Sequence, residues 1–321
     1  MPPTLDVRLL GPLEVRVDGE VIDLGPPRHR ALIALLALTP NRVVSTDRIL
    51  EALWGEEADS KEKALWVYVS RLRSALEPDR SERGESSLLV RRDPGYLLAV
   101  EPGDVDVVRF EEAVAEARTL GETDPEAALG VVDDALGLWR GDALEEFRYE
   151  DFAAGEIRRL EELRLEALEI RFEVSLGLGR DRELVGQLEQ LAREHPYREG
   201  ITRALMIALY RSGRQAEALR ALERHARTIG EELGLEPSPE LRTLEEQVLL
   251  QDDSLRRAEE LVVQADNPYR GLRAFGEDHA ADFHGRGRLT AEILRRLERR
   301  DGLVAVVGAS GSGKSSVVRA G

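Results

Sequence analysis

The period of hydrophobic and polar positions changes along the chain and divides it into parts of different expected structure. Over residues 5–24, apolar residues alternate with polar ones and are interrupted at Gly11-Pro12 and at Asp18-Gly19. Alternation with turn residues between the runs is typical of antiparallel strands, so a small sheet is predicted here. From residue 27 onward, apolar residues recur every three or four positions instead, which is the period of amphipathic helices.

The rest of the first hundred residues is predicted to hold three helices and a β-hairpin. Helices are expected at 27–38, at about 45–54 and at 60–76, and two strands joined by a tight turn over 88–98. In the third helix the apolar residues follow one another at spacings of four, three and four, which places them on one face. This order is the plan of a winged helix over 1–100, with 60–76 as the recognition helix and 88–98 as the wing.

Residues 104–252 carry the helical period throughout and are expected to form an all-helical domain that begins after Pro102-Gly103. The pair of helices over 199–233, with Gly213 at the turn, is similar to a tetratricopeptide unit. A plain helical hairpin is the alternative interpretation of this pair. An acidic linker or a trailing helix follows at 253–266. The expected helices are 106–120, 125–138, 152–177, 181–194, 199–212, 215–233 and 238–251.

Composition excludes several classes of protein. The sequence has no cysteine, so disulfides and thiolate chemistry are not available, and its five histidines are scattered. It lacks an apolar run long enough to span a bilayer, and its first residues lack the pattern of a secretion signal. We therefore expect a cytoplasmic protein that has no membrane partner.

The charge is acidic overall but unevenly distributed. The net charge of −17 argues against indiscriminate binding of nucleic acid. Residues 60–92, however, hold eight basic and five acidic residues. A local excess of basic residues on an acidic protein indicates a focused contact with DNA. An ordinary mixed surface is the alternative that charge leaves open.

The predicted recognition helix has a polar face that suits the major groove of DNA. Arginine can donate two hydrogen bonds to guanine or bind a phosphate. On the wing, Arg91 and Arg92 could reach a neighbouring groove or the DNA backbone. A surface helix with scattered arginines is the alternative that spacing leaves open. The residues on the polar face are Lys63, Val67, Ser70, Arg71 and Ser74, flanked by Lys61, Trp66 and Arg73.

A phosphate-binding motif lies near the end of the chain. The apolar run 303–307 is typical of a buried strand and leads into GASGSGKS at 308–315, a full match to the P-loop pattern. In such a loop backbone amides surround the phosphates, Lys314 reaches the β and γ oxygens, and Ser315 can hold Mg²⁺ when nucleotide is bound. The residues expected to bind nucleotide are Gly308, Gly311, Ser312, Gly313, Lys314, Ser315 and Ser316.

Several runs of residues up to about position 250 resemble the Streptomyces antibiotic regulatory protein family, abbreviated SARP. In the first hundred residues these runs are ALIALLAL at 31–38, NRVVSTDRI at 41–49, LWG at 53–55, VYVSRLR at 67–73 and GY at 95–96. The helical part is similar to the family's bacterial transcriptional activation domain. That similarity rests on Asp106, Phe110, Leu138-Trp139, Gly141-Asp142-Ala143-Leu144 and the run 233–241.

This resemblance implies an OmpR-like winged helix that binds direct repeats in promoter DNA, as a homodimer or oligomer. It also implies recruitment of RNA polymerase, control of secondary-metabolite genes, and DNA binding without a cofactor. Where Trp66 stands, members of the family often carry a small or amide residue, which leaves the readout at this position open. Carried over by position, the DNA-facing residues are Lys63, Val67, Tyr68, Ser70, Arg71 and Arg73, with Arg91 and Arg92 on the wing.

Residues 267–275 and 283–286 resemble the start of the NTPase module of STAND-type signalling proteins, which follows the activation domain in the larger SARP regulators. No metal-holding aspartate on a second strand and no sensor arginine follow the P-loop. We therefore expect 267–321 to be the truncated first part of this module, to pack only in part, and to bind ATP and Mg²⁺ in a complete parent protein. The expected fold is mainly α: an α+β winged helix, an all-α tetratricopeptide-like domain and the start of an α/β P-loop domain.

The sequence leaves three functions to compare. A DNA-binding transcriptional activator agrees with the first two domains. An ATP-dependent STAND-type switch, in which DNA binding is secondary, is the alternative that the P-loop suggests. An interaction scaffold built on the acidic helical domain is the third. Paired carboxylates are interpreted as solvated helix faces, and no nucleophile and base stand together, so we do not expect an enzyme.

Overall fold

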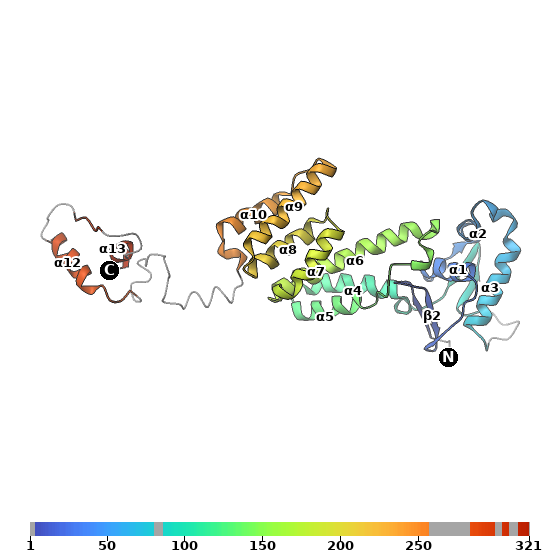
Figure 1. Ribbon diagram of the computed structural model, residues 1–321. Coiled ribbons are helices and arrows are strands. Elements are labelled where there is room, and N and C mark those ends of the chain that lie inside the picture. Colours follow the sequence, from blue (N-terminus) through green and yellow to red (C-terminus); the bar gives the residue numbers. More distant parts are fainter. Residues whose placement is uncertain (1–3, 80–85, 257–282, 299–303, 308–313, 321) are drawn as a thin grey trace. The chain divides into compact units, whose positions relative to one another are not determined.

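A computed structural model describes residues 4–79, 86–256, 283–298, 304–307 and 314–320 of the 321-residue chain. The chain forms two compact units, Met1–Leu250 and Gln251–Gly321. Helices make up most of the described residues in the first unit, with small sheets near its N-terminus (Figure 1).

The chain begins with a three-stranded antiparallel sheet, as the alternating pattern predicts. Its strands are β1 (Leu5–Arg8), β2 (Glu14–Val17) and β3 (Glu20–Val21), in that order. Val7 of β1 stands opposite Val15 of β2, and both side chains are buried. The alternation therefore separates a core-facing side of the sheet from a more exposed one.

Three helices and a hairpin complete a winged helix and confirm the predicted order of elements. The helices are α1 (Pro27–Ala37), α2 (Thr46–Trp54) and α3 (Glu62–Leu76). The hairpin consists of β5 (Leu89–Arg92) and β6 (Gly95–Leu98). Helix α3 is thus the predicted recognition helix, and the hairpin is the predicted wing.

A short strand that the hydrophobic pattern does not predict joins the wing. Strand β4 (Val44–Ser45) pairs with β6, so the second sheet has the order β4-β6-β5. A two-residue strand is too short to show alternation. A Cβ atom on Gly95 would lie 1.8 Å from the carbonyl oxygen of Val44, so only glycine permits this close approach. A 3₁₀ turn, η1 (Gly55–Ser60), separates α2 from α3 and is also absent from the sequence prediction.

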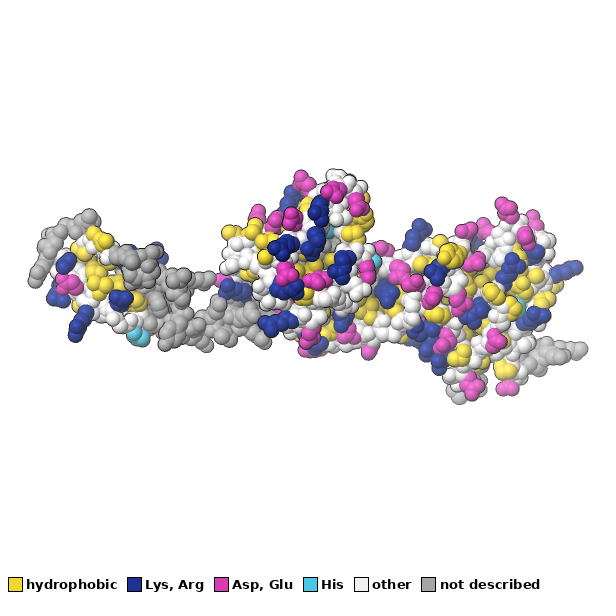
Figure 2. Space-filling view, viewed as in Figure 1, with side chains coloured by type: hydrophobic (Ala, Val, Ile, Leu, Met, Phe, Trp, Pro, Cys, Tyr) yellow, Lys and Arg dark blue, Asp and Glu magenta, His cyan; other side chains and the backbone are white. Residues whose placement is uncertain are grey.

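Seven helices follow, and their ends lie within about two residues of the predicted ones. Neighbouring helices in this part pack against each other in pairs, and Figure 2 shows acidic and basic side chains mixed over them with hydrophobic side chains between. Among the described residues no helix combines the length and the apolar character needed to cross a membrane. The helices are α4 (Asp106–Leu120), α5 (Pro125–Leu136), α6 (Asp151–Gly177), α7 (Asp181–Glu194), α8 (Glu199–Arg211), α9 (Gln215–Leu233) and α10 (Pro239–Leu250).

The winged helix and the first helices after it share one hydrophobic core. The buried cluster runs from Leu5 in β1 through α1–α3 to Phe110 in α4, Val132 in α5 and Leu160 in α6. Pro102-Gly103 therefore marks a change of architecture and not a gap in the core. The limits of the two predicted domains on either side of it stay a prediction.

The second unit holds η4 (Asp253–Leu255), α12 (Gly287–Glu298) and α13 (Lys314–Ala320) in its described residues. The buried strand predicted at 303–307 is wrong for residues 304–307, which form no strand, and Val307 is 90% exposed. A strand is stable when neighbouring strands pair with its backbone, and the described part of this unit contains no strand with which 304–307 could pair. Most of the predicted linker, residues 257–266, lies outside the described residues.

Candidate nucleic-acid interface

Helix α3 turns its apolar side to the core and its polar side to solvent. The stripe of Leu65, Val69, Leu72 and Leu76 is at most 3% exposed. The opposite side carries most of the residues that the sequence assigns to DNA contact. The exposed ones are Lys63, Val67, Ser70 and Arg71, together with Trp66 and Ser74.

The cations on this exposed face are available to a ligand. Among the described residues, neither Lys63 nor Arg71 forms an ion pair. By contrast, Lys61 at the start of α3 is paired with Glu57, with 3.0 Å between Nζ and Oε2. The apolar part of the face is also open to solvent, since Trp66 is 55% and Val67 48% exposed. This mixture of cationic, hydroxyl and apolar groups suits phosphates and base edges.

Tyr68 is placed differently from the other predicted contacts, because its ring is half-buried between helices. It stacks on Trp54 of α2, with 5.4 Å between ring centroids, and meets His29 of α1 edge-on at 4.4 Å. Burial lowers the pKa of His29 below its ordinary value, although a backbone hydrogen bond at Leu24 opposes the change. Tyr68 therefore fixes the angle of α3 against α1 and α2, and its contact with DNA stays a prediction.

Arg73 also has a structural partner. Its side chain is half-buried, and its Nε donates to the carbonyl oxygen of Leu89 at 2.9 Å. Since Leu89 begins β5, this bond joins the recognition helix to the wing. We expected Arg73 on the DNA-facing side. The structure gives it a positioning role, and its contact with DNA stays a prediction.

A second connection between α3 and the wing involves Glu77, just after the helix. Its carboxylate accepts hydrogen bonds from the hydroxyl of Ser86 and from the backbone N–H and hydroxyl of Ser87, the last two at 2.8 and 2.6 Å. Burial raises the pKa of Glu77, but these hydrogen bonds outweigh it and hold the pKa below its ordinary value. The sequence gives no local signal for this contact, because Ser86 is nine residues away.

The wing presents two further exposed cations. Arg91 and Arg92 are both exposed, and neither forms an ion pair with any described residue. They stand opposite Tyr96 and Gly95 in the hairpin. Adjacent residues of a strand point to opposite sides, so the two guanidinium groups extend from the two faces of the wing. Both α3 and the wing, which the Arg73–Leu89 bond joins, thus carry exposed cations that form no ion pair with described residues.

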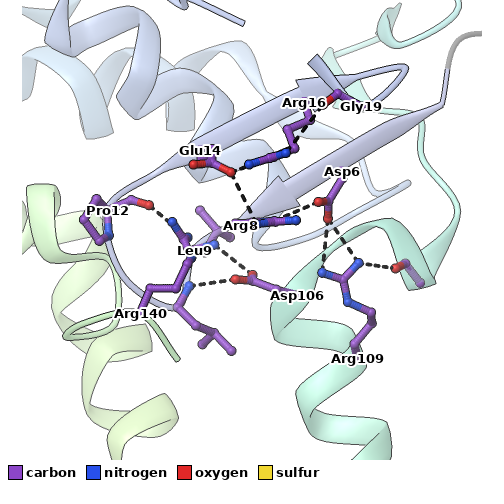
Figure 3. Close-up of polar contacts among 12 residues, drawn as sticks. Asp6, Arg8, Leu9, Pro12, Glu14, Arg16, Gly19, Asp106, Arg109 and Arg140 are labelled. Atoms are coloured by element: carbon purple, nitrogen blue, oxygen red, sulfur yellow. Dashed lines mark hydrogen bonds and ion pairs between the residues drawn. The ribbon is translucent and has the colours of Figure 1, made fainter. Parts of the chain in front are cut away.

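The winged helix is fixed to the helical part by a junction that the sequence does not reveal (Figure 3). Asp106, the first residue of α4, accepts hydrogen bonds from the backbone N–H groups of Leu9 and Leu10 at 2.8 and 3.0 Å. Arg109 binds Asp6 of β1, with both terminal nitrogens 3.1 Å from Oδ1. Arg140 donates to the carbonyl oxygen of Pro12 at 3.0 Å. These bonds tie the N-terminal sheet to α4 and to the segment after α5.

Asp106 is the most buried charged group of the junction, with 1% of its surface exposed. Burial raises its pKa above the ordinary value, while the N–H groups of Leu10 and Leu9 oppose that rise. The sequence interpretation used Asp106 only as a mark of family resemblance. Its role as the acceptor for two amides nearly a hundred residues away becomes visible only in the fold.

The predicted nucleotide site is described only at its C-terminal end. Gly308, Gly311, Ser312 and Gly313 lie outside the described residues. Lys314, Ser315 and Ser316 begin α13, where the P-loop pattern requires a helix. Ser315 is exposed and Ser316 is buried. Within the described residues no group of three His, Asp or Glu side chains is arranged to hold a metal ion.

Three family models match successive parts of the chain. The model described as "Transcriptional regulatory protein, C terminal" matches residues 19–98, which include α3 and the wing. "Bacterial transcriptional activator domain" matches 105–249, the helical part of the first unit. "Novel STAND NTPase 1" matches 268–321, which include the P-loop pattern.

Named relatives are similar over very different shares of their own length. The regulatory protein AfsR of Streptomyces griseus is 34% identical over 330 residues, covering 99% of this chain and 32% of AfsR. The regulatory protein DnrI of Streptomyces peucetius is 34% identical over 260 residues, covering 79% of this chain and 95% of DnrI. The chain thus spans about a third of the length of AfsR but matches almost all of DnrI.

A solved structure of Mycobacterium tuberculosis EmbR in complex with a low-affinity phosphopeptide has a similar fold. The TM-score is 0.73 at 33% sequence identity, and the match covers 84% of this chain and 73% of the EmbR chain. The predicted winged helix followed by a helical domain is confirmed by this likeness together with the family models.

Proposed function

Because the chain belongs to the SARP family of transcriptional regulators, we propose that it is a sequence-specific DNA-binding transcriptional activator. The observation that carries this proposal is the exposed face of α3, where Lys63 and Arg71 lie beside Trp66 and Val67 and form no ion pair with described residues. A cation without a protein partner can bind a phosphate or a guanine without first breaking a bond.

In this proposal α3 enters the major groove and the wing contacts the neighbouring backbone. Arg71 reads a base edge and Lys63 binds a phosphate, while Arg91 and Arg92 supply sequence-independent affinity from the wing. Arg73 and Tyr68 act by holding α3 in position. Trp66 and Val67 supply apolar contacts of the kind that the methyl group of thymine accepts.

The proposal includes partners that the family implies. We propose that the chain binds direct repeats in promoters as a homodimer or oligomer, recruits RNA polymerase and controls secondary-metabolite genes in the cytoplasm. The match of 105–249 to an activator domain and the names of AfsR and DnrI as regulatory proteins support this view. The junction at Asp106 supports it further. Because the junction fixes the helical part to the winged helix, a polymerase bound to the helical part would lie at a set distance from the DNA.

We also propose that residues 308–316 bind ATP and Mg²⁺ in the NTPase module. The match of 268–321 to an NTPase model supports this, and Lys314 and Ser315 open a helix as the motif requires. Lys314 would hold phosphate oxygens and Ser315 the metal ion. DNA binding through α3 needs neither, and no catalytic role is proposed for this chain. The names of the relatives favour a regulator over an ATP-driven switch as the main function.

The test is a gel-shift titration of the full chain against promoter fragments, with Arg71→Ala and Arg182→Ala as matched variants. Arg182 is an exposed arginine on α7 that lies outside the proposed reading face. If Arg71 makes a bidentate contact with a base, its loss should cost about 1–3 kcal/mol of binding free energy at the preferred site. Arg182→Ala should bind as the wild type does.

A second variant separates readout from simple attraction. Lys63→Ala should weaken binding to all duplexes about equally and reduce the slope of log affinity against log salt by about one. Unchanged affinity in both Arg71→Ala and Lys63→Ala would exclude α3 as the reading element, whatever DNA the chain binds.

A further inference from the structure

A groove lies among helices α7, α8 and α9, away from the residues assigned to DNA. Its volume is about 590 Å³, which lies in the range of pockets that hold small ligands or short peptide segments. Thr202, Leu205 and Leu209 of α8 line it, and their spacing places them on one side of the helix. Ala192 of α7 and Ala221 of α9 add small apolar side chains. These side chains close the base of the groove between the three helices, where Leu205 and Leu209 are each only 1% exposed.

The groove carries positive charge that the protein itself does not neutralise. Its two carboxylates, Glu189 and Glu217, are both bound to Arg214, at 3.4 and 2.6 Å. The remaining cations are exposed, and none of them forms an ion pair within the part of the chain that the structure describes. On a protein with net charge −17, such a group stands out. These cations are Arg193, Arg220, Arg224 and Arg227.

The spacing of these arginines matches an extended chain. Arg220, Arg224 and Arg227 are four and three residues apart on α9, so they lie on one face at intervals of about 5–6 Å. Alternate side chains of an extended peptide are about 6.6 Å apart. Successive carboxylates on one side of such a peptide could therefore each meet a guanidinium group.

The base of the groove is polar and fixed. His225 lines it with 5% of its surface exposed, and its Nδ1 lies 2.9 Å from the carbonyl oxygen of Pro196. Nε2 is buried and has no hydrogen-bond partner among the described residues. Nε2 lies 3.7 Å from Oε1 of Glu199 and is closed to solvent, so His225 fixes the base of the groove and is not offered to a ligand.

We propose that the groove between α7, α8 and α9 binds an extended acidic peptide segment of another protein. Carboxylates of the peptide pair with Arg220, Arg224 and Arg227, and its aliphatic side chains lie on the partly exposed Ala192 and Pro196. Duplex DNA is too wide to enter a groove of this volume. The proposal does not depend on DNA binding through α3.

The test uses the full chain and a fluorescein-labelled peptide of about twelve residues in which glutamate and leucine alternate. Fluorescence anisotropy should show saturable binding that weakens as salt rises, because the contacts are charged. A peptide with lysine in place of glutamate should not bind. The double variant Arg220→Ala/Arg224→Ala should lose about tenfold or more in affinity, since it removes two charge-assisted contacts. Arg182→Ala, which changes an exposed arginine of α7 outside the groove, should bind the peptide normally.

Circular dichroism of the double variant should match the wild type, and its gel-shift affinity for DNA should be unchanged, which separates failure here from failure of the activator proposal. Several results would overturn the peptide site: no binding at about 1 mM peptide, equal binding of the lysine peptide, or full affinity in the double variant. Displacement of the peptide by non-specific duplex would reassign the groove to nucleic acid. Self-association abolished by the double variant would reassign it to a second copy of the chain.

Discussion

Two groups of cationic side chains in the Met1–Leu250 unit differ in what they bind. At the junction of the N-terminal sheet and the helical part, every arginine drawn in Figure 3 has a partner within the chain. Arg109, for example, binds both Asp6 and the carbonyl oxygen of Gly103. On the reading surface the cations are exposed and have no ion-pair partner among the described residues. They are Lys63, Arg71, Arg91 and Arg92.

The difference shows how one type of side chain serves two purposes. A guanidinium with several fixed acceptors, such as Arg30 with Glu146 and the carbonyl of Leu13, holds two elements at one angle. A cation without a partner adds little to the stability of the fold, but it can bind a phosphate without first breaking a bond within the protein. The junction and the shared core hold the backbone that carries these cations, so on binding entropy is lost mainly by the cationic side chains themselves.

The largest effect is expected when the hydrogen-bond acceptor at the junction, Asp106, is removed. Asp106→Ala leaves the buried N–H groups of Leu9 and Leu10 without a partner, and each such group costs about 1–3 kcal/mol. We expect the free energy of unfolding to fall by about 2–5 kcal/mol, measured by urea denaturation followed by circular dichroism.

Asp106→Asn is the matched control for the loss at Asp106. Its single oxygen can still accept one hydrogen bond, but its amide nitrogen faces a second donor, so the loss of stability should lie between wild type and alanine. Stability equal to wild type in Asp106→Ala would show that the two amides find other acceptors. In that case the hydrogen bonds of Asp106 would not be what fixes the winged helix to the helical part.

The sequence predicts the reading surface much better than it predicts the junction. The stripe of Leu65, Val69, Leu72 and Leu76 sets which side of α3 is buried, so the exposed side follows from local spacing alone. The bonds of Asp106 join residues almost a hundred positions apart, and no local period records such a pairing.

The same reason applies to Arg73 and Tyr68, whose contacts with DNA stay predictions. Spacing places Arg73 beside the polar face and the family resemblance assigns Tyr68 to DNA, but Leu89 and Trp54 come close to them only after folding. The apolar run at 303–307 has the composition of a strand, yet a strand depends on neighbours that lie elsewhere in a sheet. Local pattern therefore decides which face of an element is buried, and tertiary contacts decide what each polar side chain does.

Arg71 and Arg73 test the difference between the two groups directly. They stand two residues apart, but Arg71 has no ion-pair partner among the described residues, whereas Arg73 binds the carbonyl oxygen of Leu89. Arg71→Ala should lower DNA affinity by about 1–3 kcal/mol and leave stability within about 0.5 kcal/mol of wild type. Arg73→Ala should also lower stability, by about 1 kcal/mol, since the bond to Leu89 is lost. Gel shifts and urea denaturation of both variants test this split. Equal stability of the two variants would show that Arg73 does not hold α3 against the wing.

The apolar half of the reading surface gives a smaller effect. If Val67 or Trp66 contacts thymine, replacing that thymine by deoxyuridine removes one methyl group and should cost about 0.8 kcal/mol of binding. The same replacement should cost nothing in Val67→Ala or Trp66→Ala, whichever residue makes the contact. The measurement is a gel shift on an operator found by repeated selection, substituted one thymine at a time. A thymine outside the operator is the control. If no replacement within the operator weakens binding, the sequence is recognised by polar groups alone.

Glu77 gives the smallest effect, and this effect depends on pH. It tests whether a partly exposed contact can also hold α3 in position. Its pKa in the folded chain is below the ordinary value, because the hydrogen bonds from Ser86 and Ser87 outweigh the effect of burial. Its contribution to stability is therefore complete above the pKa of an unfolded glutamate and is lost as the pH falls through the lower, folded value. Glu77→Gln should be about 0.5 kcal/mol less stable than wild type at neutral pH, and the gap should close in acid. A gap that stays constant with pH would mean that shape, and not charge, joins the end of α3 to the wing.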